Sequence, residues 1–125
     1  MKKTIFLLSI FLLVGLVACG SNDTSLMEKY VPKAEEVVKL LNDGSYEEVY
    51  HQFDETMKNA LPVEQMGQLK TVIEKSGEFE TFDKSTVEEQ DGFYVVVLVA
   101  KYSNEDRVYT ISFNDHDEIA GLYVR

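Results

Sequence analysis

Cysteine, basic residues and long apolar runs are all scarce in this chain of 125 residues. A single cysteine, Cys19, excludes an intramolecular disulfide framework. Lysine and arginine total 12 against 22 aspartates and glutamates, and a formal net charge of −10 is too acidic for a nucleic-acid-binding domain. The apolar run 5–17 is shorter than the roughly 20 residues that span a bilayer as a helix. A composition that is 45% hydrophobic and 27% charged favours one folded domain over a disordered chain.

Motifs that carry catalytic or metal chemistry are also missing from the sequence. There is no Gly-x-Ser-x-Gly elbow, no His-Glu-x-x-His pair, no glycine-rich phosphate loop and no cysteine pair for zinc. The acidic segment 115–118 lacks the glycine and the distal glutamate of a calcium loop, so it is interpreted as a solvated turn. His51 lies outside the apolar stripe of its helix, His116 lies in that turn, and Asp54 suits a helix cap. We therefore assign no catalytic residue, no metal ligand and no cofactor.

The N-terminus has the pattern of a processing signal. Two lysines precede the apolar run 5–17, which has the length of a signal-peptide core. The tetrapeptide that ends this segment resembles the lipobox of bacterial lipoproteins, and its residues are Leu16, Val17, Ala18 and Cys19. The resemblance implies a diacylglyceryl group on the Cys19 thiol and cleavage after Ala18, so that residues 1–18 are a cleaved signal peptide. The alternatives are an ordinary secretory peptide with a chance cysteine, or an uncleaved anchor.

Lipidation would decide where the protein works. Each buried acyl CH₂ contributes about 0.8 kcal/mol, so two chains hold a protein at a membrane without any transmembrane helix. Residues 19–25 are then a lipidated cysteine with a short tether, because 20–24 is small and polar. The expected location is the extracytoplasmic face of the cell membrane, with the acidic domain standing away from anionic headgroups.

The first half of the exported chain shows the apolar spacing of amphipathic helices. Pro32 either kinks the first helix, 26–41, or lies in its first turn. A capping box of Ser45 with Glu48 opens a second helix, and Asp54 caps a further short turn. Another helical segment then follows, which gives three or so helices in all.

From Glu78 onward the apolar spacing changes to the period of two that is typical of strands, and it predicts a four-stranded antiparallel meander. Asp-Gly at 91–92 is a two-residue hairpin turn. Longer turns are expected at 103–106 and 114–118. The expected cross-strand pairs are Val87–Val96, Tyr102–Arg107, Phe113–Ile119 and Tyr109–Tyr123.

This register divides the sheet into two apolar faces. One face should pack on the helices, and a pocket between them could be lined by Tyr46, Tyr50, Phe53, Tyr94, Tyr109 and Tyr123. The opposite face is expected to carry Val95, Val97, Val99, Val108 and Leu122. A solvated sheet face normally alternates to polar residues. The apolar side chains therefore indicate a surface that meets a second copy or an envelope protein, unless they reflect only the preference of central strands for β-branched residues.

Several short segments resemble the bacterial family known as domain of unknown function 3887. They are Asn-Asp-Gly-Ser-Tyr at 42–46, Val-Tyr at 49–50, Phe-Asp at 53–54, Met-Lys-Asn-Ala-Leu at 57–61, Gly-Glu-Phe at 77–79 and Glu-Ile-Ala-Gly-Leu at 118–122. The resemblance covers about Val31 to Val124. It implies a nuclear-transport-factor-2-like, or cystatin-like, cone in which residues 26–125 form a single α+β domain. It carries over no catalytic residues.

These observations predict an uncharacterised cell-envelope lipoprotein whose domain is a non-enzymatic binding or interaction module. Its expected partners are the membrane, through the lipid, and a second copy or envelope protein, through the sheet. One alternative is a small isomerase or hydratase with an acid or base inside the cone. The other is an accessory domain to a separate hydrolase.

Overall fold

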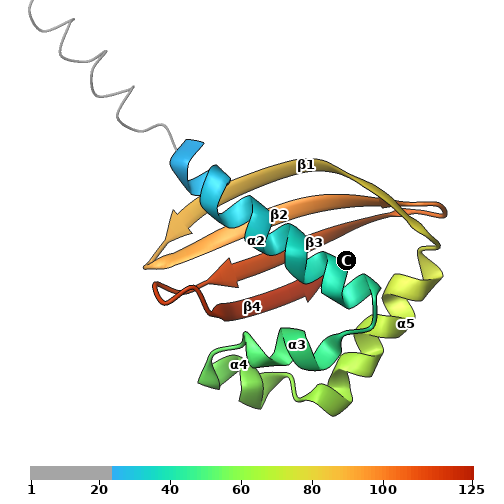
Figure 1. Cartoon of the computed structure of the whole chain (residues 1–125), viewed down its shortest axis with the longest axis horizontal. Coiled ribbons are helices and arrows are strands. Elements are labelled where there is room, and N and C mark those ends of the chain that lie inside the picture. The colour runs from blue at the N-terminus through green and yellow to red at the C-terminus, as the bar shows by residue number, and fades with distance from the viewer. Residues whose placement is uncertain (1–23) are drawn as a thin grey trace, which may run out of the picture.

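The computed structural model describes residues 24–125, in which one helix crosses a face of an antiparallel sheet and shorter helices lie beside it (Figure 1). The helices are α2 (Thr24–Asn42), α3 (Tyr46–His51), α4 (Glu55–Ala60), the 3₁₀ helix η1 (Val63–Met66) and α5 (Gly67–Lys75). The strands are β1 (Phe79–Gln90), β2 (Phe93–Tyr102), β3 (Asp106–Phe113) and β4 (Ile119–Val124), paired in that order. The predicted α+β class with a four-stranded antiparallel meander is confirmed. The predicted signal peptide 1–18, with Leu16, Val17 and Ala18, and the predicted lipidation site Cys19 lie outside the described residues.

Helix α2 buries one apolar stripe against β1 and β2. The residues of the stripe are Tyr30, Ala34, Val37, Val38 and Leu41. Pro32 lies inside the helix and not in its first turn, so the alternative start at Val31 is wrong. Thr24 and Ser25, which were expected in the tether, are already helical.

The end of α2 is a Schellman motif, and it explains why one predicted cap does not form. The Ser45 N–H donates to the Leu40 carbonyl (2.9 Å) and the Gly44 N–H to the Leu41 carbonyl (3.1 Å). Gly44 takes the positive φ of 80° that this turn requires. Because the Ser45 N–H already has a partner, Glu48 has no free donor to reach back to. The Ser45 side chain makes no capping bond, so the predicted capping box is wrong.

The segment between α3 and α4 is fixed to the first residue of β4. Asp54 caps α4 as predicted, accepting from the Met57 N–H at 2.8 Å. The Asp54 N–H donates to the Ile119 carbonyl (2.9 Å), and the Ile119 N–H donates to the Gln52 carbonyl (2.8 Å). These two bonds hold the short helices beside the edge of the sheet.

The first hairpin has the predicted register. Asp91 and Gly92 take φ values of 52° and 86°, as a two-residue hairpin turn requires, and Val87 pairs with Val96. The second turn is shorter than expected, because Ala100, not Tyr102, pairs with Arg107. The predicted Tyr102–Arg107 pair is therefore wrong by two residues. A shift of two keeps every side chain on its predicted face.

The short second turn is fixed by residues far away along the chain. The Ser103 N–H donates to the Glu78 carbonyl and the Asn104 N–H to the Ser76 carbonyl, both at 2.8 Å. The Glu78 N–H in turn donates to the Ser103 hydroxyl at 2.9 Å. The β2–β3 turn is thus tied to the end of α5, an arrangement that local spacing does not reveal.

A bulge in β4 corrects two further predictions. Phe113 pairs with Ile119 as expected, but Ser112 pairs with Gly121, so Ala120 is an extra residue in β4. Beyond it, every side chain of β4 lies on the opposite face from the one predicted. Tyr123 is 70% exposed and does not line an interior pocket, and Leu122 is buried in the core and does not belong to the opposite face.

Candidate interaction surface

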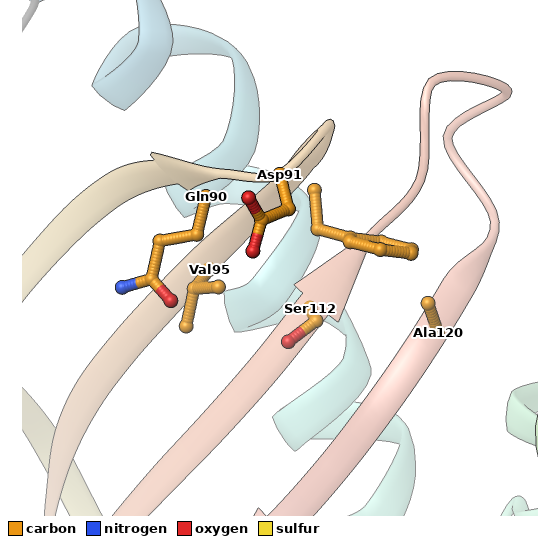
Figure 2. A pocket seen from close by; sticks show the side chains of 6 residues that line it. Gln90, Asp91, Val95, Ser112 and Ala120 are labelled. Atoms are coloured by element: carbon orange, nitrogen blue, oxygen red, sulfur yellow. The ribbon is translucent and has the colours of Figure 1, made fainter.

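The face of the sheet that points away from α2 is apolar and is not crossed by any described helix; Figure 2 views it with the helices behind the strands. We call this the outer sheet face and define it by Phe93, Val95, Val97, Val99, Val108, Thr110, Ser112 and Tyr123. Its valines are half-buried by their neighbours, while Phe93 and Tyr123 are 41% and 70% exposed. The predicted apolar face therefore exists without Leu122.

A surface hollow of about 280 Å³ opens on the outer sheet face close to the β1–β2 turn. Figure 2 shows Gln90 and Asp91 at the turn, with Val95, Ser112 and Ala120 on the three strands that follow. Ala120, the extra residue of the bulge, is one of the residues that line the hollow. The lining of the hollow combines the apolar side chains of Phe93, Val95 and Ala120 with a carboxylate, an amide and a hydroxyl.

Charged side chains lie at the ends of the outer sheet face and along its β4 edge, where Arg125 pairs with Val108. At the end that carries the β2–β3 turn, the Lys101 ammonium lies 3.4 Å from the Asp106 carboxylate. Near the other end, Glu88 is the partner of Val95 on β1. An apolar centre with charges at its margin is the usual organisation of a protein–protein contact surface.

The aromatic residues predicted to line a pocket do not gather around one cavity. Phe53 and Tyr109 are buried in the core, and Tyr46 is half-buried. Tyr94 stacks on Tyr30 of α2 with ring centroids 4.6 Å apart, and Tyr50 packs against Phe53 at 5.7 Å. Tyr123 lies on the outer sheet face, and the other five side chains are part of the core or pack against it.

Three polar side chains form a hydrogen-bonded chain in the interior that no sequence motif indicated. The Tyr109 hydroxyl lies 2.5 Å from that of Tyr102, and the Tyr102 hydroxyl donates to Asn42 Oδ1 at 2.7 Å. Burial raises the pKa of Tyr102, and burial, followed by the hydrogen bond to Tyr102, holds the pKa of Tyr109 well above its usual range. Both hydroxyls therefore stay protonated at physiological pH and link β2, β3 and the end of α2.

A second group joins α2 to the β3–β4 turn. The Tyr30 hydroxyl donates to Asp117 Oδ1 at 3.2 Å, and the ammonium groups of Lys29 and Lys33 lie 3.5 and 4.0 Å from the same carboxylate. Asn114 organises the turn, because its side-chain oxygen accepts from two backbone N–H groups within it. The turn is partly solvated, as predicted, and its Asp117 serves as an anchor for α2.

Among residues 24–125 no aspartate, glutamate, histidine, lysine or arginine is fully buried. His51 and His116 are exposed and Asp54 is engaged as a cap. Between residues 24 and 125 the polar residue that is fully buried is Ser76, whose hydroxyl donates to the Val72 carbonyl (3.0 Å) and accepts from Arg107 Nε (2.5 Å). Over the same residues, no group of three or more His, Cys, Asp or Glu side chains is placed to hold a metal ion.

No helix in the described part of the chain has the length and apolar character needed to cross a membrane. Comparison with known proteins gives one family: a model described as a protein of unknown function (DUF3887) matches residues 34–122. No curated protein and no solved structure matches the chain.

Proposed function

Because the chain belongs to the DUF3887 family of proteins of unknown function, we propose a function from its own features: a lipid-anchored, non-enzymatic interaction module of the cell envelope. The outer sheet face is its contact surface, and a lipid on Cys19 holds it at the extracytoplasmic face of the membrane. The observation that carries the binding role is the row Phe93, Val95, Val97 and Val99, which remains apolar on a sheet face that no described helix covers. The lipobox carries the anchoring role.

Two further features support a binding role over catalysis. An isomerase or hydratase of the cone type needs an Asp or His side chain inside the fold, and residues 24–125 bury no Asp, Glu or His completely. The interior is instead filled by large apolar side chains such as Tyr109, Phe53 and Phe113. The arrangement of one long helix across a curved antiparallel sheet supports assignment to the nuclear-transport-factor-2-like cones (Figure 1).

Anchoring is tested by expressing the full chain with Cys19→Ala in a bacterial host and separating membranes from soluble material. We expect the unchanged chain in the membrane fraction with the added mass of a diacylglyceryl group. The Cys19→Ala chain should lose that mass, and it should either leave the membrane or persist as uncleaved precursor. Ser21→Ala is the matched control in the tether and should behave like the unchanged chain. Equal mass and distribution for the Cys19→Ala and unchanged chains would refute lipidation.

Binding is tested separately with a photo-crosslinking amino acid placed on each side of the domain. At Val97, in the centre of the outer sheet face, irradiation of cells should yield a discrete adduct. At Lys39, which is exposed on α2 across the sheet from this face, it should yield none. The absence of any adduct at Val97, or equal adducts at both positions, would refute the binding role.

A further inference from the structure

We infer that the occupant of the outer sheet face is a second copy of this chain anchored in the same membrane. The inference rests on the proposed lipid anchor and names the partner of the proposed contact surface. Three features support it: the short connection between Cys19 and α2, the direction of the strands relative to that connection, and the symmetry of the side chains on the outer sheet face.

The connection sets how close the domain lies to the membrane. Cys19 and Thr24, the first described residue of α2, are only five positions apart. A chain advances at most about 3.6 Å per residue, so Thr24 lies within about 18 Å of the lipidated residue. The N-terminal end of α2 is therefore the end of the domain that faces the membrane.

The contacts of α2 show which parts of the sheet share that end. Near its start, Tyr30 stacks on Tyr94, close to the first residue of β2, and bonds to Asp117 in the β3–β4 turn. At its end, Asn42 accepts a hydrogen bond from Tyr102, the last residue of β2. Helix α2 thus runs in the same direction as β2 (Figure 1). The strands then lead away from the membrane, and the outer sheet face stands upright on it.

An upright face can be covered only by something that stands beside the domain at the same height above the membrane. A second copy meets this condition without any further requirement, because it carries the same anchor and the same short connection. Two copies in one membrane are related by a two-fold axis along the membrane normal, which here runs parallel to the strands and between β2 and β3. Such an axis places each row of residues, read from β1 to β4, against the same row of the other copy read from β4 to β1.

Two rows of the outer sheet face are complementary to the same row of the other copy read in the opposite direction. The central row runs Thr86, Val97, Thr110, Tyr123, so that Val97 meets Thr110 and the exposed Tyr123 packs over Thr86 of the other copy. Nearer the membrane the row is Glu88, Val95, Ser112, Gly121, so that the carboxylate of Glu88 meets the small Gly121 and no acid.

Farthest from the membrane, the charges also match. Lys101 on β2 pairs with Asp106 on β3 within one chain at 3.4 Å. The two-fold axis places Lys101 of one copy against Asp106 of the other, so four charges of alternating sign meet. A chain with a net charge of −10 repels its own copies at long range. The paired charges of Lys101 and Asp106 replace this repulsion with attraction at the end of the contact farthest from the membrane.

The size of the outer sheet face predicts a contact that depends on the membrane. Four strands spaced about 4.8 Å apart and about eight residues long cover a flat area on the order of 500 Å². This is below the ~800 Å² per partner of a standard stable interface. A shared membrane raises the effective concentration of the second copy in the way a short linker does, toward millimolar values. The pair should therefore form at the membrane far more completely than in dilute solution.

The test is cross-linking of the full chain in intact membranes. A lipidated Cys19 has no free thiol, so Val97→Cys supplies the one reactive cysteine, close to the proposed axis. A short bis-maleimide should convert this variant to a species of twice the monomer mass. Lys39→Cys should react with a monofunctional maleimide but give no dimer, and the unchanged chain should give neither product.

Two results would overturn the second copy as partner: a Val97→Cys chain that reacts with maleimide yet stays monomeric, or an adduct whose mass is not twice that of the monomer. As a second variant, Lys101→Asp should weaken the dimer band, and adding Asp106→Lys to it should restore the band. Failure of the proposed anchor would be recognised separately, because the membrane fraction of the protein would not change with Cys19→Ala.

Discussion

The hydrogen bonds of the two buried tyrosine hydroxyls predict that Tyr102→Phe and Tyr109→Phe lower the free energy of unfolding by different amounts, although each substitution removes a single oxygen. Asn42 Oδ1 can only accept, so the Tyr102 hydroxyl donates to it, and the Tyr109 hydroxyl must donate to Tyr102. Tyr109→Phe leaves the bond between Tyr102 and Asn42 in place. Tyr102→Phe removes both bonds and leaves the Tyr109 hydroxyl, at 0% exposure, without the partner it has in the fold.

The magnitudes follow from these partners. Losing one hydrogen bond while every buried group stays paired costs about 0.5–1.5 kcal/mol, which is the expectation for Tyr109→Phe. An unpaired buried hydroxyl adds about 1–3 kcal/mol, so Tyr102→Phe should cost about 2–4 kcal/mol. The double variant contains no unpaired tyrosine hydroxyl, and it should cost less than the sum of the two single substitutions.

Urea unfolding followed by far-ultraviolet circular dichroism measures these differences, because backbone signal does not depend on the tyrosine that is changed. With a urea dependence of about 2 kcal/mol per molar, Tyr102→Phe should lower the midpoint by about 1–2 M. Tyr123→Phe, on the outer sheet face, is the control and should stay within about 0.5 kcal/mol of the unchanged chain. A Tyr109→Phe cost equal to or above that of Tyr102→Phe would refute the donor order.

Two more predictions concern glycine and alkaline pH. A Cβ at Gly77, where φ is +93°, would lie 2.1 Å from Ser103 Oγ, so Gly77→Ala should cost about 1–3 kcal/mol in urea unfolding. Gly67→Ala, in the first turn of α5 with open space around it, should instead stabilise by about 0.5–1 kcal/mol, and the opposite ranking would contradict the geometry. The folded-state pKa of Tyr109 is raised above the unfolded value near 10, so its stabilisation is complete below pH 10 and is lost as the pH rises beyond it. The free energy of unfolding in urea should change little from pH 9 to 10 and should then fall by about 1.4 kcal/mol per pH unit above pH 10 for this residue, and a fall that Tyr109→Phe does not reduce would count against it.

Local signals predicted the parts of this fold that depend on nearby residues. Asp91 and Gly92 set the first hairpin, and Asp54 caps α4, because a turn or cap depends on only a few adjacent positions. The second turn depends instead on Ser76 and Glu78, which lie about 25 residues earlier, so its length was wrong by two residues. That error preserved the faces of the strands, and the apolar outer sheet face was identified in spite of it.

The β4 bulge could not be predicted, because the sequence around it carries no alternation to read. Residues 119–124 are all apolar, glycine or tyrosine, so both phases of a period of two fit equally well. Leu122 and Tyr123 were therefore exchanged between the faces. The error moved a tyrosine into the predicted pocket and a leucine onto the predicted contact face. Tyr102 bonds to Asn42 across 60 positions of the chain, and Asp117 bonds to Tyr30 across 87. The spacing of residues along the sequence does not predict contacts between positions so far apart.

The bonds between Ile119 and the α3–α4 segment also govern the order in which the protein can be assembled. During synthesis the helices emerge first, yet α2 needs β1 and β2 to cover its apolar stripe, and Gln52 and Asp54 need Ile119. The first half of the chain therefore has no stable partner until nearly the whole domain has been made. Folding that waits for residue 119 leaves the chain without a stable tertiary structure through most of its synthesis.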